Sequence, residues 1–443
     1  MHWRISACLA LTSLAAVLLE PSGAHAMRAP SAQVTTLYVF QGPPDAGHPD
    51  AGVIIAEGSI FGSTSWGGPA GLGAVYRLTP GSSGYTETVL HSFAGGSDGA
   101  RPSAVSADRG GNLYGTTSSA GGSGCSGGCG TVFEMKKRPQ SRLGYVERVL
   151  YQFQGGTDGS SPVAAPLIGP HGAIYGTTQS GGGATACGGG CGTVFRLTRT
   201  SSGYSESVLY RFQGGSDGSF PVAGLIVDRS GAFYGTTLTG GGSALCPTGC
   251  GTVFKLTPAS SGYVETVLYR FLGGHDGAGL FAGVTAGDRG ELFGTAALGG
   301  GGYPQSCAYN GISSGCGTVF KLSPRSSGYI KRTLYKFSDA TTDGAGPWGG
   351  VTVGADGTLY GTTVFGGNCG VANFGCGTAY SLSHTSGGYH FTLLYSFPGY
   401  AAAFPYAGLL LSNGVLYGTS SQGGVGNCDP TSYACGTVFE LTP

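Results

Sequence analysis

The sequence has 443 residues, of which 89 are glycine and only 10% are charged, and its 22 basic and 22 acidic side chains cancel. This neutrality excludes a basic nucleic-acid-binding face and an electrostatic membrane-binding patch. The glycines follow no Gly-X-Y triplet, which excludes collagen, and an aromatic content of 11% excludes a disordered glycine-rich linker.

Residues 1–26 have the pattern of a secretory signal peptide. Arg4 supplies the positive start, an apolar run covers residues 5–19, and residues 24–26 read Ala-His-Ala, a typical cleavage signal. The alternative is a membrane anchor, but the apolar run is too short to span and no stop-transfer charges follow it. We therefore expect an exported protein, extracellular or periplasmic, without a membrane span after signal removal.

Residues 212–271 show the unit from which the rest of the chain is built. They contain four short runs rich in Val, Ile, Tyr, Phe and Thr, each bounded by Gly, Pro, Ser or Asp: VAGLIVD, AFYGTT, GTVFKLT and YVETVLYRF. Such runs are typical of β-strands. Four strands in about 60 residues predict one small antiparallel sheet for each unit.

Three motifs recur in every unit along the chain. The LYxF motif starts at Leu37, Leu90, Leu150, Leu209, Leu268, Leu334 and Leu394. An LYGTT-like motif starts at Ile60, Leu113, Ile174, Phe233, Leu292, Leu359 and Leu416. The GTVF motif starts at Gly130, Gly192, Gly251, Gly317 and Gly436, with degenerate copies at Gly73 and Gly377. Seven copies with a steady period indicate a solenoid, a propeller or an array of separate units.

The first and last segments distinguish between these architectures. Residues 33–40 have the pattern of a fourth strand without the preceding three, and residues 436–443 that of a third strand without a fourth. Together they complete one unit, whereas an open solenoid would need polar caps. The sequence therefore predicts an all-β fold with one domain over residues 33–443. This domain is a seven-bladed β-propeller of four-stranded antiparallel blades, whose N-terminal strand joins the C-terminal blade and closes the ring.

Twelve cysteines follow the signal segment, and they fall as one pair in each of six units, between the LYGTT-like and GTVF motifs. The pairs are Cys125/Cys129, Cys187/Cys191, Cys246/Cys250, Cys307/Cys316, Cys369/Cys376 and Cys428/Cys435. Because each pair flanks one hairpin loop of an exported chain, we predict a disulfide within each unit. The alternative is zinc, which needs four ligands. Equivalent loops on a ring lie far apart and no histidine accompanies any pair, so we predict no metal.

The long, variable loops are expected on one face of the ring, where binding residues concentrate. This face carries the cysteine loops and the inter-blade loops, while the turns after strands one and three lie on the other. An aspartate recurs in six inter-blade loops: Asp45, Asp98, Asp158, Asp217, Asp276 and Asp343. We interpret it as an Asx-turn that holds the loop. A calcium site is the alternative, but it needs several converging oxygen ligands.

One position in the PxAG-like run before the innermost strand varies while its neighbours repeat. It is occupied by Asp50, Ser103, Val163, Val222, Phe281, Trp348 and Tyr406. We expect these side chains near the mouth of the channel, and aromatic rings there suit sugar rings or apolar groups. The candidate ligand-binding residues are therefore Phe281, Trp348, Tyr406 and Asp50. The alternative is that the rings plug the channel or pack on neighbouring blades.

The unit GTVFxLTP…GYxExVLYxF…GGxDGxxPxAGLxxDxxGxLYGTTxxGG resembles the GloVer (gloeo/verruco) tandem repeat of bacterial exported β-propeller-like proteins. The resemblance covers roughly residues 37–443, with several motifs in the same order in each unit. It implies an exported repeat protein, and the family has no established activity and no catalytic residues to transfer.

The leading hypothesis is an exported, non-enzymatic protein that binds carbohydrate or another cell-surface ligand on the loop face. No sialidase box or nucleophile elbow is present, so we predict no catalytic residues and no cofactor, and we expect a monomer. One alternative is an extracellular polysaccharide hydrolase or lyase that uses inter-blade carboxylates such as Asp45 and Asp50. Another is a structural or protein-interaction scaffold.

Overall fold

The computed structural model describes residues 32–301, 307–309, 312–313, 315–338, 342–367, 369, 375–424 and 434–443. The predicted signal peptide at residues 1–26 lies outside these residues. The described part contains no α-helix, only β-strands and two short 3-10 turns, Pro170–Gly172 and Gly274–Asp276. No helix among the described residues is long and apolar enough to cross a membrane.

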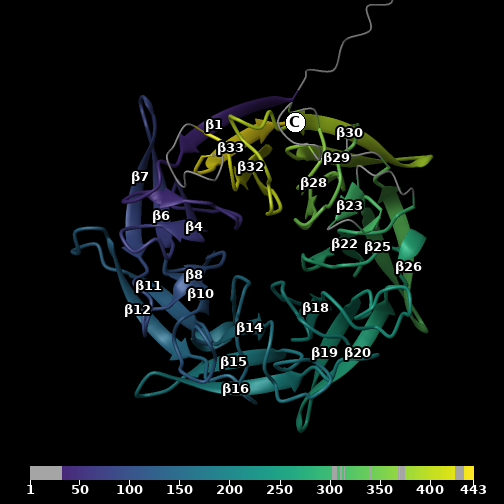
Figure 1. Ribbon diagram of the computed structural model, residues 1–443, viewed down its shortest axis with the longest axis horizontal. Helices are drawn as coiled ribbons and strands as arrows, with labels where there is room; N and C mark the ends of the chain where they lie inside the picture. The colour runs from purple at the N-terminus through teal and green to yellow at the C-terminus, as the bar shows by residue number, and fades with distance from the viewer. Residues whose placement is uncertain are drawn as a thin grey trace, which may run out of the picture. The chain divides into compact units, whose positions relative to one another are not determined.

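Seven antiparallel sheets form the blades of a propeller, arranged in a ring (Figure 1). From the inner strand outward, blade 1 consists of β3 (Ile54–Ala56), β4 (Ser59–Thr64), β6 (Ala74–Gly81) and β7 (Gly84–Ser92). Blade 2 consists of β9 (Ser106–Ala107), β10 (Leu113–Ser119), β11 (Thr131–Lys137) and β12 (Tyr145–Gln152). Blade 3 consists of β13 (Leu167–Ile168), β14 (Ile174–Thr178), β15 (Thr193–Arg199) and β16 (Tyr204–Arg211). Blade 4 consists of β17 (Ile226–Val227), β18 (Phe233–Thr237), β19 (Thr252–Ala259) and β20 (Gly262–Arg270). Blade 5 consists of β21 (Thr285–Ala286), β22 (Leu292–Ala296), β25 (Thr318–Arg325) and β26 (Gly328–Lys336). Blade 6 consists of β27 (Thr352–Val353), β28 (Leu359–Thr363), β29 (Thr378–Thr385) and β30 (Gly388–Ser396). Blade 7 consists of β31 (Leu410–Ser412), β32 (Val415–Ser420), β33 (Thr437–Thr442) and β1 (Gln33–Val39).

Short pairings supplement these blades. In blade 2, β8 (Ala100–Pro102) also pairs with β10. Two hairpins lie outside the blades, formed by β2 (Ala46–Gly47) with β5 (Trp66–Gly67) and by β23 (Ala308–Tyr309) with β24 (Ile312–Ser313).

The ring closes through the N-terminal strand, as the sequence predicts. Strand β1 pairs antiparallel with β33, so that Gln33 lies opposite Thr442. A second link joins blade 7 to blade 1, because the Thr419 hydroxyl donates a 3.0 Å hydrogen bond to the carbonyl of Ala51. The predicted all-β fold, the seven blades and the closure of the ring by the N-terminal strand are therefore confirmed.

The inner strands are shorter than the apolar runs suggest. The run VAGLIVD predicts a strand of several residues, but β17 contains only Ile226 and Val227. The preceding carbonyls are used by the neighbouring blade instead: the Thr177 hydroxyl donates to the carbonyl of Ala223 at 2.9 Å. The first threonine of the LYGTT-like motif thus bonds blade to blade.

The glycine of the LYGTT-like motif makes room for an aromatic ring. A Cβ at Gly235 would lie 2.5 Å from Cζ of Phe254 on the next strand, far inside contact distance. The same approach recurs in all seven blades, at Gly62, Gly115, Gly176, Gly235, Gly294, Gly361 and Gly418. The motif therefore has a packing reason that is independent of any ligand.

That ring in turn contacts the last residue of the LYxF motif of the preceding blade. The seven pairs have ring centroids 5.0–5.2 Å apart and planes at 62–70°, an edge-to-face arrangement. They are Phe40 with Tyr76, Phe93 with Phe133, Phe153 with Phe195, Phe212 with Phe254, Phe271 with Phe320, Phe337 with Tyr380, and Phe397 with Phe439. One repeated contact thus joins every blade to the next.

The first prediction concerns ring closure. Phe40 and Phe212 are both fully buried and make the same contact, one at the closure and one in the middle of the chain. We expect Phe40→Ala and Phe212→Ala each to lower the free energy of unfolding by about 3–5 kcal/mol. Chemical denaturation measures both values. A Phe40→Ala variant as stable as wild type, beside a destabilised Phe212→Ala variant, would contradict closure through β1.

Candidate functional site

The loop face is the side of the ring that carries the cysteine loops and the inter-blade loops. Each inter-blade loop is held against the strand-two-to-three loop of the preceding blade by a backbone hydrogen bond. Phe220 N–H donates to Cys191 at 2.9 Å, and Phe404 N–H donates to Cys376 at 2.8 Å. Both phenylalanines have a positive φ, at 56° and 57°, which non-glycine residues seldom adopt. The surrounding hydrogen bonds therefore hold these loops in one conformation.

Disulfides reinforce the same loops. Five of the six predicted pairs are bonded within their units: Cys125 with Cys129, Cys187 with Cys191, Cys246 with Cys250, Cys307 with Cys316, and Cys369 with Cys376. Cys435 is also disulfide-bonded, and Cys428, its predicted partner, lies outside the described residues. Five disulfides are consistent with an oxidising compartment outside the cytoplasm.

Three of the four predicted binding residues lie together near the inner edge of the loop face. The rings of Phe281 and Trp348 stack with centroids 4.6 Å apart and planes at 10°. Trp348 also lies 5.3 Å from Tyr406, and its edge meets Phe365 at 6.3 Å. Phe404 meets Phe365 at 6.3 Å. We call these five side chains, from blades 5 to 7, the aromatic arc.

All five rings of the aromatic arc are partly exposed. The stacked pair covers one face of Phe281 and one face of Trp348, so the rings pack against neighbouring blades and still present apolar surface. Sequence reasoning missed Phe365 and Phe404, although Phe404 stands two positions before Tyr406 in the same loop. Participation of the arc in binding stays a prediction.

Asp50, the fourth predicted residue, lies in a polar stretch beside the arc. Its carboxylate accepts a hydrogen bond from the Ser65 hydroxyl, and its backbone N–H donates to the carbonyl of His48 at 2.9 Å. A Cβ at Gly52 would lie 3.7 Å from that of Ala407, so the Asp50 segment runs next to the Tyr406 segment. His48, Asp50 and Ser65 are here called the polar arc.

The recurrent loop aspartates hold the inter-blade loops, as the sequence predicts, but by different bonds. In an Asx-turn the carboxylate would bond two residues onward. Asp217 instead accepts from the N–H of Gln213, four residues back, at 2.6 Å, and from the hydroxyl of Tyr210 at 2.9 Å. Asp45 accepts from the Tyr38 hydroxyl and from two backbone N–H groups. These carboxylates are engaged in loop structure.

A glutamate of the next blade faces the loop aspartate at four blade interfaces. The pairs are Asp45 with Glu87, Asp98 with Glu147, Asp158 with Glu206, and Asp217 with Glu265. One carboxylate oxygen of each glutamate is buried without a hydrogen-bond partner. Burial, followed by the charge of the aspartate, raises the pKa of Glu206 and of Glu265 to about 7, and that of Glu87 to about 8.

At the other three interfaces, a different residue stands at the position of this glutamate. In blade 5, Lys331 replaces the glutamate and donates a hydrogen bond to Asp276 at 2.8 Å. Phe391 takes the position in blade 6 and stacks on Tyr335 at 4.5 Å. In blade 7 the position is held by Val34, where the facing loop has lost its aspartate. The residue at this position therefore varies with what it faces.

A pocket of about 600 Å³ lies on the opposite, turn face, between blades 2 and 3. Its wall includes the nearly buried carboxylate of Glu134, which accepts from the Tyr114 hydroxyl at 3.1 Å. Lys136, Arg148 and Arg199 also line it. The turns on this face are short in most units, so no site was expected there. The sequence signal that could have indicated this pocket is the longer, basic turn KKRPQSRLG after the GTVF motif of blade 2.

Comparisons with known proteins agree with this architecture. The family model of the Gloeobacter/Verrucomicrobia repeat matches residues 22–182, 139–308 and 301–443. Comparison with curated proteins finds no match.

Two solved structures are similar to this chain at low sequence identity. A fungal alcohol oxidase of the AA5 family, solved in complex with copper, is 13% identical with a TM-score of 0.50, over 93% of this chain and 76% of that chain. A candidate 6-phosphogluconolactonase from Bacteroides uniformis is 13% identical with a TM-score of 0.49, over 81% of this chain and 88% of that chain. At 13% identity, the similarity to the alcohol oxidase shows the fold alone.

The second prediction concerns pH. The folded pKa of Glu206 and Glu265 lies above the usual 4.5, at about 7, so their contribution to stability is fully present below about 4.5 and is lost as pH rises through about 7. We expect Glu206→Gln with Glu265→Gln to melt at a higher temperature than wild type at pH 8 and similarly near pH 4.5. Melting curves from pH 4 to 9 measure this, with the exposed Glu57→Gln as control. Parallel curves for wild type and the double variant would contradict it.

Proposed function

The chain belongs to the Gloeobacter/Verrucomicrobia repeat family, and we propose that it is an exported, non-enzymatic propeller that binds carbohydrate with its loop face. The disulfides and the signal-peptide pattern of residues 1–26 support export. The proposed binding surface consists of the aromatic arc and the adjacent polar arc.

The observation that carries the proposal is the convergence of Phe281, Trp348 and Tyr406. They occupy one repeat position in three successive units, where other units have Ser103, Val163 or Val222. Trp348 contacts both of the other rings. Partly exposed rings held by their neighbours offer a large apolar area at low entropic cost, which suits the C–H face of a sugar ring.

The polar arc supplies the complementary chemistry. Sugar hydroxyls need hydrogen-bond partners once they leave water, because an unpaired buried polar group costs about 1–3 kcal/mol. Asp50 and His48 lie on the segment that runs next to the Tyr406 segment. A ligand that covers the aromatic arc would therefore reach carboxylate and imidazole groups at its edge.

The alternative of a polysaccharide hydrolase or lyase depended on Asp45 and Asp50. Hydrolysis of a glycoside requires two carboxyl groups placed across the scissile bond. Asp45 accepts two backbone hydrogen bonds from its own loop and one from the Tyr38 hydroxyl of β1. Asp50 belongs to the polar arc and accepts a hydrogen bond from the Ser65 hydroxyl, so of the two it is the residue available to a ligand.

The third prediction tests the proposed surface by substitution. Phe281→Val, Trp348→Val and Tyr406→Val introduce the residue found at the same position in blades 3 and 4, so the variants are expected to fold. The triple variant should bind polysaccharide at least about tenfold more weakly, since a tenfold loss corresponds to about 1.4 kcal/mol. A polysaccharide panel with calorimetry and a reducing-end assay measures binding and turnover.

Val163→Ala, at the equivalent position in blade 3, which does not adjoin the blades of the arc, is the matched control and should bind like wild type. Unchanged affinity in the triple variant would refute the arc as the binding surface. Release of reducing ends by wild type would support the hydrolase alternative, and absence of any polysaccharide binding would favour a scaffold.

A further inference from the structure

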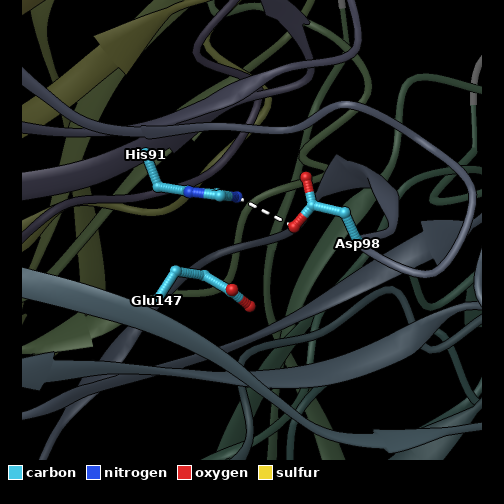
Figure 2. Close-up of side chains that lie close together, drawn as sticks. All are labelled: His91, Asp98 and Glu147. Carbon is cyan, nitrogen blue, oxygen red and sulfur yellow. Dashed lines mark hydrogen bonds and ion pairs between the residues drawn. The ribbon is translucent and has the colours of Figure 1, made fainter.

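His91, Asp98 and Glu147 converge between blades 1 and 2, on the outer part of the ring. His91 lies on β7, Asp98 in the following inter-blade loop and Glu147 on β12 of the next blade. Figure 2 shows the imidazole and the two carboxylates directed into one space. His91 Nε2 lies 3.0 Å from Asp98 Oδ1, and one ligand atom of each of the three residues lies within 4.8 Å of the others.

The donor set and its spacing suit a metal ion. Zinc binds imidazole nitrogen and carboxylate oxygen at about 2.0–2.2 Å in tetrahedral geometry, which puts neighbouring ligand atoms roughly 3.3–3.6 Å apart. His91 Nε2 and Asp98 Oδ1, which are 3.0 Å apart and hydrogen-bonded without a metal, lie a few tenths of an ångström closer than this spacing. A carboxylate oxygen of Glu147 lies within 4.8 Å of the other two ligand atoms, and its buried Oε1 makes no hydrogen bond that would be broken.

Asp98 is oriented by the backbone behind it. Its second oxygen, Oδ2, accepts a 2.7 Å hydrogen bond from the N–H of Ala94, which leaves Oδ1 facing His91. A hydrogen bond of this kind behind a ligand fixes the carboxylate orientation and commonly accompanies metal ligands. The loop therefore presents Asp98 in a suitable pose without any ion.

The repeats within the chain show why this interface differs from its neighbours. The position of His91 is occupied by tyrosine in every other unit, and Tyr151, Tyr210 and Tyr269 donate their hydroxyl proton to the loop aspartate at 2.9 Å. A phenol that donates its proton is not a metal ligand, whereas a neutral imidazole has a free lone pair. Among the residues that the structure describes, only the interface between blades 1 and 2 combines a nitrogen donor with two carboxylates at this position.

A cation already occupies the equivalent space at another interface. At the interface between blades 4 and 5, the ammonium group of Lys331 takes the place of the glutamate. It donates hydrogen bonds to Asp276 Oδ1 at 2.8 Å and to the Thr333 hydroxyl at 3.0 Å. The Lys331 side chain is only 4% exposed there. The architecture of the interface therefore accepts a positive charge against the loop aspartate.

We propose that His91, Asp98 and Glu147 bind a divalent first-row transition metal, with Zn²⁺ as the first candidate. Imidazole nitrogen with carboxylate oxygen favours Zn²⁺ over Ca²⁺, which takes oxygen ligands. The His91 and Asp98 side chains are 22% and 21% exposed, so a fourth position is open to water. The ion would cross-link blade 1 to blade 2. This site is separate from the aromatic arc and does not depend on the proposed carbohydrate binding.

The fourth prediction uses tag-free protein freed of metal with EDTA. We expect wild type to bind one equivalent of Zn²⁺ in calorimetry, to melt at a higher temperature with Zn²⁺, and to give a visible Co²⁺ spectrum. His91→Tyr introduces the residue of the other units, and Glu147→Gln removes a carboxylate. Each should weaken Zn²⁺ binding at least about 100-fold, the upper range for loss of groups that only support a ligand.

Glu206→Gln, the same change at the next interface, is the matched control and should bind Zn²⁺ like wild type. No binding of Zn²⁺, Co²⁺, Ni²⁺, Cu²⁺ or Mn²⁺ by wild type would overturn the proposal. Binding that survives His91→Tyr, or binding of Ca²⁺ alone, would overturn it too, because the imidazole would then have no role. If His91→Tyr melts at a lower temperature than metal-free wild type, the proposal is judged on the Zn²⁺ affinity of Glu147→Gln, because that substitution keeps the shape of the side chain.

Discussion

The edge-to-face contact between successive blades is the interaction on which the rest of the structure depends. It explains two sequence constraints together: the ring that ends each LYxF motif must meet an aromatic ring of the next blade, and that ring needs a glycine beneath it. Phe40 makes this contact with Tyr76, so the closing blade is joined by the same packing as the others. The repeated sequence motifs are therefore explained by the aromatic contact that each blade makes with the next.

The rigid inter-blade packing leaves the loop face free to vary. Its loops are held by the aspartates, by backbone bonds to the preceding blade and by disulfides within single loops. Individual side chains can then change without loss of the loop conformation, as Val222 and Trp348 show at the same repeat position. This separation of scaffold from surface is the physical basis for proposing a binding role for the aromatic arc.

Much of the fold follows from the sequence because it depends on contacts that repeat. The motif period predicts seven blades, and the cysteine spacing predicts local disulfides that are confirmed for five pairs. Contacts between blades are harder to infer, because one unit does not show which residue of the next it faces. Glu147 beside His91, and Glu134 in the turn-face pocket, were missed for this reason. The aspartates were found, but not the direction of their hydrogen bonds.

Hydrogen exchange of the native protein tests ring closure most directly, because it reports the stability of each strand separately. Strand β1 is separated from its partner β33 by nearly the whole chain, and only closure gives it a ladder. Amides of residues 33–39 are expected to exchange as slowly as those of β20, the equivalent outer strand of blade 4. Rapid exchange in residues 33–39, beside slow exchange in β20, would contradict a ring closed through the N-terminal strand.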